Sequence, residues 1–117
     1  MKPLLILITT LFAGMAMASD VEIVKVEAVQ SGGAWRFDVT LRHDDTGWEH
    51  YADGWDVLAP DGTSLGLRVL VHPHVNEQPF TRSLGGVVIP EGITAVTIRA
   101  RDNVDGWTDT PYLLALP

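Results

Sequence analysis

The most constraining feature of the chain is a strict two-residue alternation in the segment AWRFDVTLRH, residues 34–43. Large apolar side chains occupy every second position, and polar or charged side chains lie between them; the apolar ones are Trp35, Phe37, Val39 and Leu41. Successive side chains of a strand point to opposite faces, whereas a helical face repeats about every 3.6 residues. The segment is therefore predicted to be a β-strand that is buried on one face.

Six further segments have the length and composition of short strands, and turn signals separate them about every eight to twelve residues. The expected strands are residues 21–30, 34–43, 54–60, 63–71, 80–89, 93–102 and 112–116. Pro-x-Gly sequences at residues 60–62 and 90–92 are typical of turns, because Pro fixes φ and Gly tolerates positive φ. With no helical periodicity, the chain is predicted to be all-β: an antiparallel β-sandwich of about seven strands.

The last third of the chain, VIPEGITAVTIRARDNVDGWTDTPYLLAL, resembles the end of fibronectin type III domains. It has a Pro-Gly corner, an alternating strand, a Gly-containing hairpin loop and a final strand. The resemblance implies a fibronectin-III/Ig-like sandwich. The chain departs from that pattern because no corner tyrosine lies between Ile93 and Arg101. The chain also resembles small exported proteobacterial proteins of unassigned function, and that resemblance implies no activity.

The first eighteen residues have the pattern of a secretory signal peptide. Lys2 provides a positive n-region, Leu4 to Phe12 is an apolar run, and Ala16-Met17-Ala18 is a small-x-small cleavage signal. The apolar run is shorter than the roughly 20 residues that cross a bilayer as a helix. Residues 1–18 are therefore predicted to be removed, which leaves a single β-sandwich domain, residues 19–117, in the periplasm or outside the cell.

The predicted mature chain is acidic and contains no sulfur. It has seven Lys and Arg against fifteen Asp and Glu, and all three Met lie in the predicted signal peptide of a chain without Cys. An acidic surface repels phosphate backbones and anionic lipid, so we expect neither a nucleic-acid partner nor membrane insertion after cleavage. Any metal site must use nitrogen and oxygen ligands, which suit Cu(II) or Zn.

Three predicted loops carry most of the chemically distinctive side chains. They join expected strands two and three, four and five, and six and seven, so they alternate with the remaining connections and should lie at one end of the sandwich. These loops are residues 43–55, 72–79 and 102–111, and they hold all four His and three of the four Trp. Because functional side chains of a sandwich are usually on end loops, a binding site is predicted there.

Loop histidines suggest a divalent-metal site. The candidate ligands are His43, His50, His72, His74 and Glu49. His43 continues the inward-facing positions of its strand, and His-x-His can place two imidazoles near one ion. Imidazole together with carboxylate suits Cu(II) or Zn. Two alternatives stay open: the four His belong to a structural polar network, or they contact a ligand or partner.

Loop aromatics suggest a second class of function, a carbohydrate- or protein-binding accessory module. Trp48, Trp107 and Tyr51 are the candidate contacts, whereas Trp35 and Trp55 are expected in the core. A third possibility is a purely structural domain. No G-x-S-x-G nucleophile elbow is present, and no metalloprotease or EF-hand spacing occurs. The sequence therefore predicts a small exported binding protein rather than an enzyme.

Overall fold

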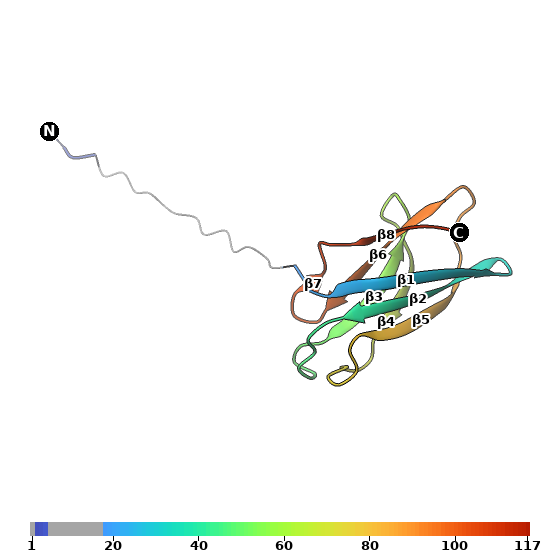
Figure 1. The fold of residues 1–117 in the computed structure, drawn as a ribbon. Helices are drawn as coiled ribbons and strands as arrows, with labels where there is room; N and C mark the ends of the chain where they lie inside the picture. Colours follow the sequence, from blue (N-terminus) through green and yellow to red (C-terminus); the bar gives the residue numbers. More distant parts are fainter. Residues whose placement is uncertain (1, 5–17) are drawn as a thin grey trace.

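The computed structural model describes residues 2–4 and 18–117. The predicted signal peptide, residues 1–18, lies almost entirely outside the described residues. No helix in the described ranges is long and apolar enough to cross a membrane. The single-domain prediction therefore concerns the part of the chain that follows Ala18, and the strands of that part form two sheets (Figure 1).

Eight strands make up the described fold, and every strand pairing between them is antiparallel. Strands β1, β2 and β5 form one sheet in that order, and β4, β3, β6 and β7 form the other, where β8 also pairs with β6. The strands are β1 (Glu22–Ser31), β2 (Ala34–Arg42), β3 (Ala52–Leu58), β4 (Ser64–Val69), β5 (Phe80–Val87), β6 (Ala95–Asp102), β7 (Gly106–Trp107) and β8 (Tyr112–Ala115). The predicted all-β two-sheet fold is confirmed, and it is consistent with immunoglobulin-like architecture.

The alternation of β2 explains the position of the core. Its apolar side chains face the second sheet, and Phe37, Val39 and Leu41 are each fully buried. From the second sheet, Trp55 and Ile98 meet them at 0% exposure. The predicted core positions of both Trp35 and Trp55 are therefore confirmed.

One part of the strand prediction was wrong. Residues 102–111 were expected to be a loop, but Gly106–Trp107 forms the short strand β7, which pairs with Arg101 and Asp102 of β6. A two-residue strand carries no periodicity that a sequence can show. The pairing extends the sheet at that end and places Trp107 against the guanidinium of Arg99, whose Cζ is 3.9 Å from the ring centroid.

The loops that follow β2, β4 and β6 lie together at one end of the sandwich, as predicted (Figure 1). The Asp45 carboxylate in the first loop accepts a hydrogen bond from the His74 N–H in the second, at 2.8 Å. The Asn103 amide in the third loop donates to the carbonyl of Trp48 in the first, at 3.0 Å. Side chains from distant parts of the chain therefore meet at this end.

Candidate metal site

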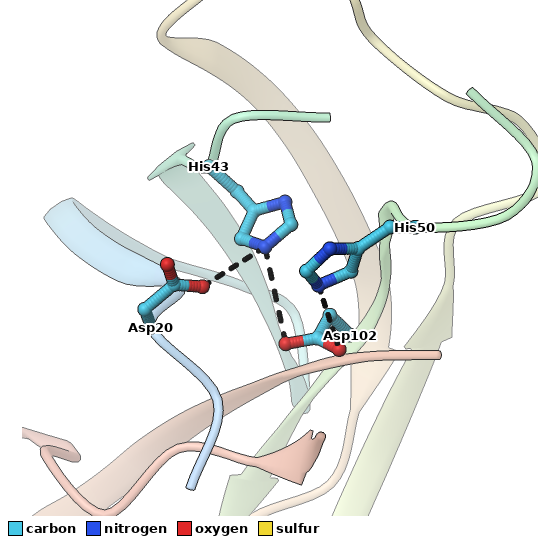
Figure 2. A group of neighbouring side chains, drawn as sticks. All are labelled: Asp20, His43, His50 and Asp102. Atoms are coloured by element: carbon cyan, nitrogen blue, oxygen red, sulfur yellow. Dashed lines mark ion pairs between the residues drawn. The ribbon is translucent and has the colours of Figure 1, made fainter. Parts of the chain in front are cut away.

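A cluster of two imidazoles and two carboxylates occupies the loop end of the sandwich (Figure 2). We call it the His–Asp cluster; its members are Asp20, His43, His50 and Asp102. Each residue offers one ligand atom, and these atoms all lie within 4.8 Å of one another. Asp20 precedes β1, His43 follows β2, His50 precedes β3 and Asp102 ends β6. The cluster therefore joins both sheets.

Strand register delivers the two most buried members. His43 comes two positions after Leu41 and continues the inward face of β2, and its side chain is 1% exposed. Asp102 comes two positions after Ala100 on the inward face of β6, and its side chain is 0% exposed. The apolar faces of the two sheets thus end in a histidine and an aspartate that face each other, with His43 Nε2 3.9 Å from Asp102 Oδ2.

A tight turn places the second imidazole. The Thr46 N–H donates to the His50 carbonyl at 3.0 Å, and the His50 N–H donates to the Gly47 carbonyl at 3.2 Å. Gly47 has a φ of 146°, which side chains rarely adopt, and a Cβ there would lie 2.8 Å from Glu49 Oε2. This turn directs His50 Nε2 to 3.3 Å from Asp102 Oδ1.

Asn103 fixes that turn against the end of β6. The side-chain carbonyl of Asn103 accepts from the Tyr51 N–H at 2.9 Å, and the backbone N–H of Asn103 donates to the Tyr51 carbonyl at 3.1 Å. The side-chain NH₂ of Asn103 donates to the Trp48 carbonyl. Because Asn103 is adjacent to Asp102, these bonds hold the loop that carries His50 beside the buried carboxylate.

Asp45 fixes the tautomer and the orientation of the His43 ring. Its carboxylate is 0% exposed, and Oδ1 lies 2.6 Å from His43 Nδ1. A carboxylate at Nδ1 holds the proton there and leaves Nε2 to face the other ligands, which is the usual support of a metal-binding histidine. Nε2 in turn lies 3.0 Å from Asp20 Oδ1. Two atoms with lone pairs at this distance require a proton or a metal cation between them.

Two atoms of the cluster are buried without a hydrogen-bond partner, namely His50 Nε2 and Asp102 Oδ2. A buried polar atom without a partner costs about 1–3 kcal/mol, so it calls for an explanation. In Figure 2 His50 Nε2 faces the Asp102 carboxylate and Asp102 Oδ2 faces His43 Nε2, so each atom is directed towards another member of the cluster. A cation bound there would satisfy both atoms.

Asp102 is charged in the folded protein. Burial alone would raise the pKa of Asp102, but the N–H of Asp105, the Ser19 side chain, the N–H of Val104 and the nearby His50 together hold it below its ordinary value. The two N–H groups donate to Oδ1 at 2.7 and 2.8 Å. The cluster therefore has an ionised buried carboxylate at its base.

The spacing of the ligand atoms suits a small divalent ion. A tetrahedral zinc ion with ligands at roughly 2.0–2.2 Å places neighbouring ligand atoms roughly 3.3–3.6 Å apart. In the cluster, His43 Nε2 to Asp20, His50 Nε2 to Asp102 and His43 Nε2 to Asp102 are 3.0, 3.3 and 3.9 Å. The two distances to Asp102 run to its two different oxygens, and the four ligand atoms all lie within 4.8 Å of one another, so a four-coordinate site requires side-chain shifts of up to about one ångström.

The other predicted metal ligands lie elsewhere in the loop end. Glu49, His72 and His74 do not belong to the cluster. His74 stacks on Phe80 with ring centroids 4.0 Å apart, and His72 is exposed with Nδ1 near the Pro73 carbonyl. The cluster instead includes Asp20 and Asp102, which the sequence analysis did not single out.

His74 is a structural histidine. Its Nε2 lies 2.8 Å from Arg82 Nη2, so the neutral ring accepts from the guanidinium. Burial first, then the charges of Arg82 and His72, lower the pKa of His74 below its ordinary value near 6.5, although Glu77 and Asp45 act in the opposite direction. The ring is therefore uncharged at neutral pH.

This geometry predicts an acid-sensitive contribution to stability. In the unfolded chain His74 binds a proton near its ordinary pKa, whereas the folded protein resists that proton. The contribution is therefore complete above about pH 6.5 and is lost as the pH falls towards the lower folded pKa. Urea unfolding with EDTA present should show that the free energy of unfolding falls less between pH 7.5 and pH 5 in His74→Gln than in the wild type, because the amide of Gln does not titrate. Equal losses in both proteins would contradict the prediction.

The predicted aromatic contacts differ in exposure. Trp48 is 65% exposed and packs edge-to-face on Tyr51, with ring centroids 5.6 Å apart. Trp107 is half-buried, and its ring faces the guanidinium groups of both Arg99 and Arg101. Of the three candidates, Trp48 therefore presents the most accessible surface beside the cluster.

Comparison with known proteins gives one informative similarity. The chain is 43% identical over 89 residues to a protein of Halomicrobium mukohataei that is described as "Putative lipoprotein". The aligned part covers 75% of this chain but 43% of the relative, so the chain spans less than half of that protein's length. No family model matches the chain, and no solved structure matches it.

Proposed function

We propose that this chain is a non-catalytic binding protein whose His–Asp cluster takes up a divalent metal ion, Zn(II) or Cu(II). The observation that carries the proposal is the convergence of two imidazoles and two carboxylates around two buried atoms that have no hydrogen-bond partner. Nitrogen and oxygen ligands of this kind suit both ions. The support that Asp45 gives to His43 is the support that a metal ligand needs.

The competing explanation is a polar network in which protons take the place of the metal. A doubly protonated His43 could bridge Asp45 and Asp20, and the Nε2–H tautomer of a neutral His50 could donate to Asp102. That network needs a proton on both Nε2 atoms, whereas a metal ligand needs both Nε2 atoms free of a proton. Metal uptake at neutral pH with release of protons therefore separates the two explanations.

Calorimetric titration with Zn(II) and Cu(II) tests the proposal. The tagless chain from Ser19 onward should bind one equivalent of metal with a dissociation constant below about 1 μM, which corresponds to a binding free energy of roughly −8 kcal/mol. His43→Ala/His50→Ala should abolish this binding, because it removes both nitrogen ligands. The matched control is His72→Ala, which alters an exposed loop histidine outside the cluster and should bind like the wild type. Binding that survives the double substitution would refute the site.

An exported location is part of the proposal. The apolar run and cleavage signal of the first eighteen residues support it, and so does the similarity to a protein described as a lipoprotein. The specific resemblance to fibronectin type III domains, beyond the two-sheet all-β architecture, remains a prediction from the last third of the chain.

The second candidate function is contact with a carbohydrate or protein ligand through Trp48 and Tyr51. The observation that favours it is that Trp48 is 65% exposed while Asn103 holds its backbone in place. An ordered, exposed indole is a surface on which a sugar ring or an apolar side chain can stack. A glycan-array screen that compares the wild type with Trp48→Ala tests it, and retained binding in the variant would exclude Trp48.

A further inference from the structure

The backbone of His43 is held by a side chain from the loop between β4 and β5. The β2–β5 ladder ends at the pair Leu41–Phe80, and His43 and Gln78 are the residues that lie two positions beyond it. Pro79 has no N–H, so it cannot donate a further backbone bond there. The Gln78 side chain replaces the backbone, because its Oε1 accepts from the His43 N–H at 3.1 Å. Gln78 thus fixes the main chain of a proposed metal ligand.

The same Gln78 side chain holds the peptide of His74. Its Nε2 donates to the His74 carbonyl at 2.9 Å, and the His74 N–H donates to Asp45 Oδ2 at 2.8 Å. Asp45 Oδ1 in turn lies 2.6 Å from His43 Nδ1. These contacts form a closed ring of hydrogen bonds, which we call the Gln78 clamp; its members are His43, Gln78, His74 and Asp45. The clamp holds His43 twice, by its backbone and by its imidazole.

The clamp is anchored to β5 through the His74 ring. The ring stacks on Phe80 with centroids 4.0 Å apart, and its Nε2 lies 2.8 Å from Arg82 Nη2. Phe80 is 2% exposed and belongs to the hydrophobic core. His74, which the sequence suggested as a metal ligand, is therefore the fixed point against which His43 is held.

We propose that Gln78 is a positioning residue of the metal site, and that the loop of residues 72–79 and the bound ion stabilise each other through the clamp. This inference rests on the proposed function. A metal ligand must stay within about 0.5 Å of its productive place, and supporting hydrogen bonds achieve this. Gln78 limits movement of the His43 backbone, and Asp45 limits rotation of its ring. Because coupling between two parts of a protein is reciprocal, an ion that holds His43 also holds the loop.

Calorimetric titration of the chain from Ser19 onward tests the positioning role. Gln78→Met keeps the length of the side chain but removes the amide that donates and accepts. It should raise the Zn(II) dissociation constant about tenfold or more, as is usual when a metal ligand loses an orienting partner. The matched control is Gln30→Met, which changes an exposed residue of β1 at the opposite end of the sandwich. The control should bind like the wild type.

Amide hydrogen exchange separates positioning from a general gain in stability. In the wild type, Zn(II) should slow exchange of the His74 N–H at least about tenfold, although His74 is not a member of the His–Asp cluster. The reference is the Ala59 N–H, which donates to the Thr63 carbonyl outside the loop end. Zn(II) should slow exchange at Ala59 less than at His74. In Gln78→Met this difference between the two amides should disappear.

The possible results distinguish the clamp from the metal site. Equal Zn(II) affinity in Gln78→Met and the wild type would overturn the role of Gln78 and leave the metal site in place. Absence of Zn(II) binding in both proteins would refute the proposed function and the positioning role with it. Exchange in EDTA tests the clamp without metal: the His74 N–H should exchange faster in Gln78→Met than in either the wild type or Gln30→Met. Equal rates in all three proteins would show that the clamp does not hold the loop.

Discussion

Saturation with Zn(II) is expected to raise the thermal midpoint of the chain by roughly 10–20 °C. A ligand that binds only the folded state, at a concentration about 100 times its dissociation constant, adds about 2.7 kcal/mol to the free energy of unfolding. In a domain of about one hundred residues, each kcal/mol shifts the midpoint by about 4–8 °C. The size of the effect follows from the cluster, since its four ligands are brought together only by the folded sandwich.

Asp102→Asn is the sharpest control for this result. The amide can keep an oxygen for the N–H groups of Val104 and Asp105, but it loses the negative charge that a metal needs. The variant should therefore have a midpoint near that of the wild type in EDTA and show almost no rise with Zn(II). Differential scanning calorimetry of both proteins, with and without metal, makes the comparison. An equal rise in the variant would place the metal elsewhere.

Asp45→Ala is expected to cost about 3–5 kcal/mol of stability even without metal. The Asp45 carboxylate accepts from His43 Nδ1 and from the backbone N–H groups of Ala52 and His74, at 2.6, 2.9 and 2.8 Å. Removing a buried acceptor leaves its donors without partners, and hydrogen bonds to charged groups contribute about 1.5–3 kcal/mol each. Such losses do not add fully, because the loop can relax.

Asp44→Ala is the matched control, because it removes a neighbouring carboxylate that is exposed. A substitution of this kind normally changes stability by less than about 0.5 kcal/mol. Urea unfolding in EDTA measures the free energy of unfolding of both variants. A loss of less than about 1 kcal/mol in Asp45→Ala would show that the three contacts do not stabilise the fold. In the metal-bound state Asp45→Ala should also weaken Zn(II) affinity about 10–100-fold, because His43 loses its orienting partner.

The fold was predictable because the apolar positions of the alternating sequence pattern are also the positions that are buried in the core. In β2 each apolar position of the pattern is a core position, and the turn residues lie at the ends of the strands. β4 shows the limit of that reasoning. Its alternation is just as regular, but the side that faces the sandwich depends on the space between the sheets, here set by Leu84 against Gly66. A sequence does not show this space.

The candidate site was only partly predictable. His43 was identified because it continues an apolar face at a strand end, and the same signal applies to Asp102 after Val96, Ile98 and Ala100. His72 and His74 were included for their spacing, and their ring centroids do lie 4.6 Å apart, but His74 Nε2 faces Arg82 and its ring packs on Phe80. Asp20 could not be identified by any strand pattern, because it lies before β1 and reaches the cluster through tertiary packing.

The origin of the ligands in both sheets has a kinetic consequence. Asp20 and His43 lie beside the sheet of β1 and β2, whereas His50 and Asp102 lie beside that of β3 and β6. We therefore expect the complete ligand set to form only after the two sheets have packed. Interactions that are absent from the transition state slow unfolding without accelerating folding. A bound ion would thus act on the lifetime of the folded protein, which determines its resistance to irreversible unfolding.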